Sequence, residues 1–238
     1  ACPLPIGIQM LPRGGADLLV LAGTADGPQY DAFIDAYLDP TKAAVSIDYF
    51  VSLIFFMRQV TGDPNLSAEA ALAGIRDPRF ADHRKFLINA VLSRELRAGG
   101  RGKVDGLEAG LGYERGYAAI ATLYPGAELK GSTAWQGDII MDVSKIRTYL
   151  GGSIDIAAPG GSLQVSALSS TATGPTNGVL TINGGEIRIF TGLDTIINTS
   201  RILTARGGDV TIWSSYGDID AGKGKKSALT NPPVTYAL

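Results

Sequence analysis

The sequence is poor in the residues that build metal centres and disulfides. Among its 238 residues, Cys2 is the only cysteine and His83 is the only histidine. A single cysteine excludes an internal disulfide and any cysteine-cluster metal site. Because only one histidine accompanies it, a zinc site of ordinary composition is not expected. The sequence therefore predicts neither a metal nor a cofactor.

Charge and long apolar runs are also scarce. Charged residues make up 18% of the chain and the formal net charge is −2, so we expect no general attraction to nucleic acid or to an anionic membrane. The longest apolar run, YFVSLIFFM at 49–57, includes Ser52 and is far too short to span a bilayer. The first residues, ACPLPIGIQM, lack the basic region and apolar core of a signal peptide. We interpret the chain as a segment cut from a longer protein.

Glycine, by contrast, is abundant at 31 residues, and it marks an internal repeat. The stretches GGSIDIAAPGGSLQV (151–165) and GGDVTIWSSYGDIDA (207–221) align without gaps. Each consists of a glycine turn, a short strand, a second turn and another strand. A third copy, GGEIRIF (184–190), has the first strand of the pattern. Because apolar and polar residues alternate, each strand is predicted to have one apolar face.

Short strands separated by glycine turns, without helix-length connections between them, favour a solenoid of stacked coils. The alternation predicts three residues that point into the coil: Ile156, Ile189 and Ile212. It predicts that three of their neighbours point outward: Asp155, Arg188 and Thr211. An antiparallel sandwich built from the same strands is the alternative, and periodicity alone does not separate the two.

A helical zone precedes these strands. The stretch ADLLVLAG (16–23) is typical of one strand, and from about 28 to 124 apolar residues recur at three- and four-residue spacing. Helix starts are expected at Ser46, Ser67 and Asp77, residues whose side chains can cap a helix. We therefore divide the chain into first strands at 1–27, a helical insertion at 28–130 and coils at 131–238. An insertion lets the strands on either side rejoin, so residues 16–23 should pair with a strand of the C-terminal half.

The longest predicted helix follows Asp77-Pro78. Its inward residues should include Phe80, Leu87 and Val91, together with Ile88, Leu92 and Leu96. We expect it to end at Gly99-Gly100, because glycine favours helix termination. A glycine-rich connector at 101–106 and a last helix at about 107–123 should follow.

Three stretches resemble filamentous-haemagglutinin-type exoproteins: LSRELRAGGR (92–101), RGYAAIATLYPG (115–126) and GGDVTIWSSYGDIDAGKGKKSAL (207–229). These are very large surface proteins of Gram-negative bacteria, often exported by two-partner secretion and often labelled adhesins or haem-utilisation proteins. The resemblance covers about residues 28–235. It implies a mainly β protein, a right-handed parallel β-helix shaft with an α-helical insertion. The N-terminal secretion domain of such proteins is not recognisable here.

The resemblance implies a location and a general role more than an activity. It implies a secreted, extracellular or cell-surface segment that is structural and adhesive and binds a glycan or protein on a host or neighbouring cell. An outer-membrane transporter would be a partner during secretion of the full-length protein. Related shafts also present or deliver a C-terminal toxin, which is an alternative role. We identify no catalytic centre and do not expect an enzyme.

Two motifs that often carry chemistry have simpler explanations in this chain. GDIDAGKG (217–224) has the spacing of a phosphate-binding loop up to Gly222-Lys223, but Gly224, followed by two lysines, stands where serine or threonine is required. Pro232-Pro233 also leaves little room for the helix that such a loop needs. His83 is not accompanied by a GxSxG elbow. We interpret the loop as a solvated turn and the histidine as a surface residue.

Carboxylates are the more serious enzymatic alternative. Parallel β-helices in other families cleave polysaccharides with acidic residues. Stacked coils can place two carboxylates as far apart as the catalytic pair of a glycosidase. The candidates are Asp138, Asp142, Asp155, Asp209, Asp218 and Asp220. Three of them follow glycine, where aspartate is also a common turn residue. Calcium binding by these residues lacks the nonapeptide repeat that would support it.

Two aromatic residues are candidates for ligand contact. Trp213 and Tyr216 lie on the turn side of their repeat, where the earlier copy has Ala157 and Gly160. An exposed pair at this position would offer rings on which a sugar could stack. The alternative is that both rings pack against a neighbouring element such as the helical insertion.

Overall fold

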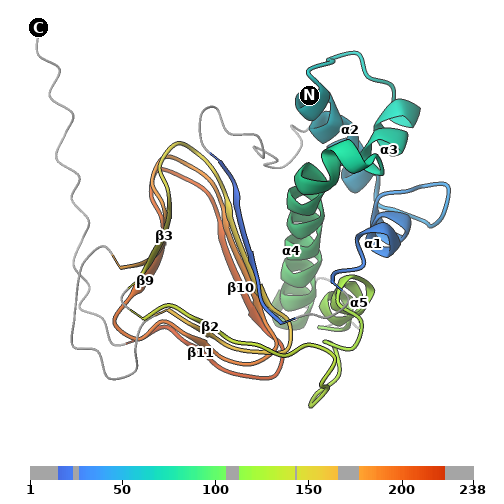
Figure 1. Cartoon of the computed structure of the whole chain (residues 1–238). Helices are drawn as coiled ribbons and strands as arrows, with labels where there is room; N and C mark the ends of the chain where they lie inside the picture. Colours follow the sequence, from blue (N-terminus) through green and yellow to red (C-terminus); the bar gives the residue numbers. More distant parts are fainter. Residues whose placement is uncertain (1–15, 24–26, 106–112, 143, 166–176, 223–238) are drawn as a thin grey trace, which may run out of the picture.

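The computed structural model describes residues 16–23, 27–105, 113–142, 144–165 and 177–222. These residues form three sheets and five α-helices, and the helices gather on one side of the sheets (Figure 1). All pairings between the described strands are parallel. The antiparallel sandwich is therefore wrong for this part of the chain, whereas stacked parallel strands agree with the predicted coils.

Each sheet receives one strand from each complete coil of the described residues. Sheet A contains β1 (Leu18–Leu21), β4 (Ile154–Ala158), β7 (Ile187–Thr191) and β10 (Val210–Ser214). Sheet B contains β2 (Ile139–Ile140), β5 (Leu163–Gln164), β8 (Thr195–Ile196) and β11 (Ile219–Asp220). Sheet C contains β3 (Lys145–Thr148), β6 (Gly178–Thr181) and β9 (Arg201–Thr204). From β2 onward the chain visits sheets B, C and A in that order and then repeats the order.

The interior of the coils is a set of apolar rows. Val20, Ile156, Ile189 and Ile212 are register partners across sheet A. Ile156 and Ile189 are almost fully buried, and Ile212 packs against the same apolar cluster. The prediction that the three isoleucines point inward is confirmed. Residues at the intervening positions lie on the outer face of sheet A, because side chains alternate along a strand.

The corner between sheets C and A uses a threonine that sequence reasoning overlooked. The three register partners Thr148, Thr181 and Thr204 each donate a hydroxyl hydrogen bond to a glycine carbonyl oxygen four residues later, at 2.6, 3.1 and 2.8 Å. The accepting glycines are Gly152, Gly185 and Gly208. The available signal was T-x-x-G-G, which occurs at 148–152, 181–185 and 204–208.

The second glycine of this corner allows the coils to stack closely. A Cβ atom on Gly185 would lie 2.2 Å from the carbonyl oxygen of Gly152, and one on Gly208 would lie 1.9 Å from that of Gly185. Both glycines also have positive φ, which side chains disfavour. Glycine is therefore required where one corner rests on the next.

The helices interrupt the first coil at the corner between sheets A and B. Strand β1 pairs with β4 over Leu18↔Ile154 to Leu21↔Ala157, which confirms that residues 16–23 rejoin the C-terminal half. Residues 22–138 thus occupy the place that residues 159–162 occupy in the next coil. The insertion leaves the strands on either side in register.

The inserted helices are α1 (Tyr30–Tyr37), α2 (Ile47–Thr61), α3 (Ala68–Ile75), α4 (Ala81–Asp105) and α5 (Glu114–Leu123), with a 3₁₀ turn at Pro78–Phe80. Two predicted caps are confirmed. Ser67 accepts a hydrogen bond from the Ala70 amide, and Asp77 accepts one from the Arg79 amide. Ser46 takes the N-cap position of α2 without a side-chain hydrogen bond.

The predicted end of α4 is wrong. The helix continues through Gly99-Gly100 to Asp105, so residues 101–105 of the expected connector at 101–106 are helical, and residue 106 lies outside the described part. Each glycine costs about 1 kcal/mol relative to alanine in a helix interior. Gly99 is buried in the packed part of the helix, and tertiary packing commonly overrides propensity on this scale. The expected start of the last helix near 107 lies outside the described residues.

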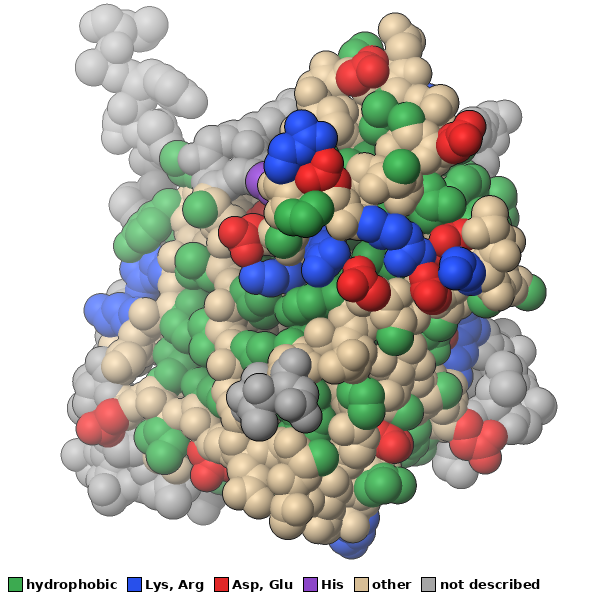
Figure 2. Space-filling view, turned by 45° about the vertical axis from the view of Figure 1, so that its right-hand side comes forward, with side chains coloured by type: hydrophobic (Ala, Val, Ile, Leu, Met, Phe, Trp, Pro, Cys, Tyr) green, Lys and Arg blue, Asp and Glu red, His purple; other side chains and the backbone are tan. Residues whose placement is uncertain are grey.

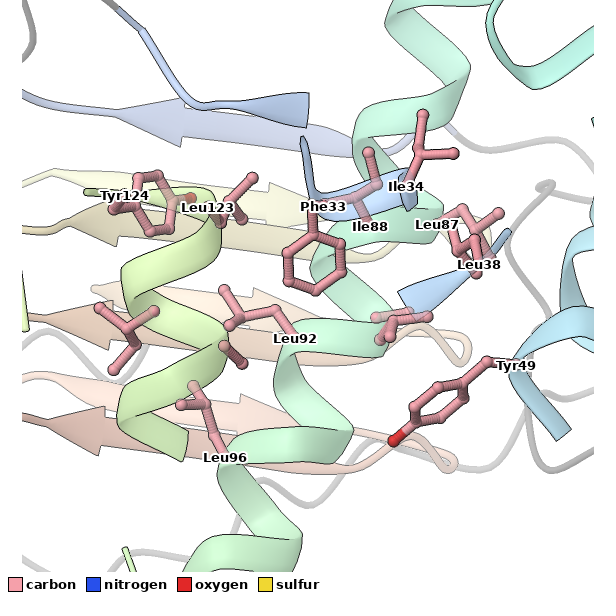
Figure 3. Packing of buried hydrophobic residues seen from close by; sticks show 14 of the residues in the cluster. Phe33, Ile34, Leu38, Tyr49, Leu87, Ile88, Leu92, Leu96, Leu123 and Tyr124 are labelled. Atoms are coloured by element: carbon pink, nitrogen blue, oxygen red, sulfur yellow. The ribbon is translucent and has the colours of Figure 1, made fainter. Parts of the chain in front are cut away.

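The helices cover the outer face of sheet A. Figure 3 shows α4 running across the strands, and Leu92 and Leu96 of this helix line one cavity together with Phe190 of the sheet. A second apolar cluster joins helical residues such as Phe33 and Leu87 to Ala157 and Phe190 of the sheet. The residues predicted to line the inner face of α4 are buried, with Phe80 partly so. Two cores therefore flank sheet A, one inside the coils and one beneath the helices.

Candidate functional site

The outer face of sheet A carries a buried ion pair. Asp155 and Arg188 point away from the coil interior as predicted, but they are only 2% and 6% exposed because α4 covers them. Arg188 donates from Nη1 to Asp155 Oδ1 at 2.8 Å and from Nε to Glu186 Oε2 at 2.9 Å. Burial alone would lower the pKa of Arg188, but the two carboxylates outweigh it and the net shift is upward. Asp155 therefore cannot serve as a carboxylate that an external polysaccharide could reach.

A second carboxylate at the edge of this face is partly buried. Asp17 precedes β1 and accepts a hydrogen bond from the Ser153 amide at 2.7 Å. Burial raises the pKa of Asp17 to about 6, and the Ser153 amide opposes that shift only in part. The carboxyl group thus links β1 to β4 and titrates well above an ordinary aspartate.

The remaining candidate carboxylates are exposed: Asp138, Asp142, Asp209, Asp218 and Asp220. Two of them take part in stacking at the corner between sheets A and B. Asp138 Oδ1 accepts from the Ser162 amide at 2.7 Å, and the Asp218 amide donates to Asp194 Oδ1 at 2.8 Å. These contacts match the turn interpretation of the two residues. Asp218 and Asp220 lie two residues apart at β11, so they remain the pair on which the polysaccharide hypothesis rests.

Within the helices, Glu95 is a buried carboxylate with a complete set of partners. It is 3% exposed, and Arg115 donates to its two oxygens at 2.7 and 2.9 Å. The Tyr49 hydroxyl also donates to it, and burial together with Glu95 raises the pKa of Tyr49. A carboxylate this fully paired ties α2, α4 and α5 together and has no oxygen left for chemistry.

The two candidate ligand-contact residues pack against the helices. Trp213 is 9% exposed, and its ring meets those of Tyr113 and Tyr117 edge-on at 5.6 and 5.7 Å. A Cβ atom on Gly116 would lie 2.7 Å from the indole, so that glycine makes room for it. Tyr216 stacks on Tyr117 at 5.9 Å and donates its hydroxyl to the carbonyl oxygen of Glu128.

The two aromatic residues line different hollows. Trp213 lies in a groove of about 830 Å³ between β10, the end of α4 and the start of α5. Arg97, Arg101 and Tyr113 also line this groove, and Arg97 is paired with Asp209 at 2.9 Å. Tyr216 lines a separate pocket of about 130 Å³ with Trp135 and Leu129. The structure therefore brings the predicted pair together only through their shared neighbour, Tyr117.

Comparison with known protein families gives a match at the C-terminal end of the chain. The family described as "Filamentous haemagglutinin family outer membrane protein" matches residues 207–238. No curated protein and no solved structure matches the chain. The match supports a link to proteins of the filamentous haemagglutinin type and, with it, a cell-surface or secreted location.

The filamentous haemagglutinin match begins at the last threonine–glycine corner. It includes β10 and β11, and therefore the Trp213 side of the groove. Of the phosphate-loop-like stretch, residues 217–222 lead into and out of β11, whereas residues 223 and 224 lie outside the described part.

The structure also locates the histidine and the side chains that could form a metal site or a membrane span. His83 is exposed, as predicted, and its ring lies edge-on to that of Phe80 with the ring centroids 6.4 Å apart. In the described ranges no group of three or more acidic, histidine or cysteine side chains is placed to hold a metal ion. No helix there has the length and apolar character needed to cross a membrane. Figure 2 shows basic and acidic side chains interspersed over the helical side of the molecule, without a large patch of one sign.

Proposed function

We propose that the chain is a structural and adhesive segment of a large secreted, cell-surface exoprotein of a Gram-negative bacterium. The observation that carries this proposal is the cycle of parallel strands, which returns to the same three sheets coil after coil. In the proposal the coils form a right-handed parallel β-helix shaft. The filamentous haemagglutinin match over the last coil supports the same role.

A shaft acts by holding surface area at a distance from the cell, and this requires rigid stacking. Apolar rows fill the coils and the T-x-x-G-G corners set the spacing between them. Adjacent coils in such a stack lie about 4.8 Å apart. The proposed role needs no polarised nucleophile or activated water, so the segment is expected to bind without turnover. Export of the full-length protein would use an outer-membrane transporter.

The groove beside β10 is the proposed adhesive surface. Tyr113 is 44% exposed at this groove, and its ring packs edge-on against Trp213. Arg97 and Arg101 add hydrogen-bond donors along the same side. An exposed aromatic ring next to such donors suits a glycan or a protein side chain on a host or neighbouring cell.

Binding of the purified chain to immobilised glycans and to cells tests this proposal. Tyr113→Ala should weaken binding at least tenfold, whereas Tyr149→Ala should not. Tyr149 is a matched control because it is 60% exposed and lies next to sheet C, away from the groove. Equal binding by both variants would contradict the groove as the adhesive surface. Reproducible turnover of a glycan would contradict the non-catalytic role.

A further inference from the structure

A small cavity lies between α4 and the outer face of sheet A. Its volume is about 20 Å³, and apolar side chains such as Leu92 and Phe190 form much of its wall. Polar side chains of Asn89 and Ser93 line it from α4, and those of Asp155 and Arg188 line it from the sheet. The cavity is thus apolar over much of its surface but has a polar wall on both the helix and the sheet.

Two polar atoms of this lining have unused hydrogen-bonding capacity. Ser93 Oγ and Asp155 Oδ2 are fully buried and make no hydrogen bond to any residue in the described part of the chain. The residues are 5% and 2% exposed, so bulk water does not reach them. Buried polar atoms of native proteins are almost always hydrogen-bonded to protein or to ordered water. Asp155 Oδ1 is already bonded to Arg188. The Asn89 amide lies close enough to lower the pKa of Asp155, but burial outweighs it and the net shift is upward, so the carboxylate can still accept a further hydrogen bond at Oδ2.

The size and chemistry of the cavity fit one water molecule. A buried water needs a cavity of roughly 10–15 Å³ and two to four polar partners. A cavity of about 20 Å³ admits one water and nothing larger. Ser93 can donate and a carboxylate oxygen can accept, so a water between them satisfies both.

We propose that this cavity is a hydration site whose single water bridges Ser93 of α4 and Asp155 of β4. The water accepts a hydrogen bond from Ser93 Oγ and donates one to Asp155 Oδ2. The inserted helices would thereby be joined to the coils by a polar bridge as well as by apolar packing. This inference is independent of the proposed adhesive role, because it concerns buried side chains beneath α4 and not the groove beside β10.

A crystal structure of the unaltered chain at high resolution tests the proposal directly. The expected result is an electron-density peak at hydrogen-bond distance from both Ser93 Oγ and Asp155 Oδ2. A cavity without such a peak, or a Ser93 hydroxyl turned to a backbone carbonyl of its own helix, would overturn it.

Oxygen-17 magnetic relaxation dispersion in solution provides the second measurement. Ser93→Val fills the cavity with an added methyl group and should reduce the number of long-lived waters by one. Ser144→Val, the same change at an exposed serine, should leave that number unchanged. An unchanged number in folded Ser93→Val would overturn the proposal. If that variant does not fold, the density in the unaltered chain still decides the question.

Discussion

Replacing Gly185 by alanine should destabilise the coils far more than the same change at the adjacent Gly184. The two glycines are consecutive and have φ of +89° and +81°. Placing alanine at either position costs about 1–2 kcal/mol, because a side chain disfavours left-handed backbone. The two variants therefore lose the same free energy through the backbone and differ only in the atoms that the new Cβ meets.

The surroundings decide the difference. A Cβ atom at 184 meets nothing within 4 Å, whereas one at 185 would lie 2.2 Å from the Gly152 carbonyl oxygen and 2.7 Å from its carbon. Relieving such a clash typically costs a further ~1–3 kcal/mol. The displaced oxygen also accepts the Thr148 hydroxyl at 2.6 Å, and losing that bond costs about 1 kcal/mol. The total is roughly 3–6 kcal/mol for Gly185→Ala against about 1–2 kcal/mol for Gly184→Ala.

Thermal unfolding followed by circular dichroism, with urea titration alongside, measures the difference. In a chain of this size each kcal/mol lowers Tm by about 2–4 °C. Gly185→Ala should therefore melt roughly 6–24 °C below the unaltered chain, and Gly184→Ala about 2–8 °C below it. Equal shifts for the two variants would refute the argument that adjacent corners are in direct contact.

Three further predictions concern charged groups. Asp155→Ala removes one of the two carboxylates that pair with the buried Arg188 guanidinium, leaves only Glu186, and should lower the free energy of unfolding by about 3 kcal/mol in urea titration. Arg97→Ala, which removes an exposed ion pair, should cost about 1 kcal/mol or less. Because the pKa of Asp17 rises from 3.8 to about 6 on folding, the folded chain binds this proton more tightly, and the free energy of unfolding should fall as pH rises from about 4 to 6. Asp17→Asn should flatten this pH dependence of the urea midpoint. The same pH dependence in the variant and in the parent chain would contradict the assignment to Asp17. Neither the parent chain nor Asp218→Asn should release reducing ends from polysaccharide samples. Cleavage by the parent chain that is lost in Asp218→Asn would instead favour an enzyme.

Local patterns in the sequence were sufficient for the parts of the fold that depend on neighbours in the chain. Alternation identified the inward faces of Ile156 and Ile189, and capping chemistry located Ser67 and Asp77. The change from helical spacing to a period of two also indicated an inserted segment, and from it followed the pairing of residues 16–23 with a strand of the C-terminal half, which the structure identifies as β4. These features are fixed by steric and hydrogen-bonding rules that act over a few residues.

The parts that were missed depend on contacts between distant segments. Alternation placed Asp155 on the outer side of its strand, but it could not tell that α4 would cover that side. Glycine propensity suggested a stop at Gly99-Gly100, where packing continues the helix. The sequence likewise did not identify the residue that packs on Trp213, which the structure shows to be Gly116 of α5. Each of these needed the insertion to be docked onto sheet A, and no local rule specifies docking.

The position of the insertion has a consequence for how such a chain can diversify. The first coil accepts residues 22–138 at the corner between sheets A and B while β1 and β4 stay paired. The equivalent corners at 159–162, 192–194 and 215–218 join the same two sheets by short turns. Leu193 is 46% exposed at the second of these corners, but its amide donates to the Gly161 carbonyl oxygen at 3.0 Å and its own carbonyl oxygen accepts from the Thr191 and Ser214 hydroxyls. A foreign loop grafted at this corner must therefore preserve these stacking bonds if the rows beneath are to keep their register.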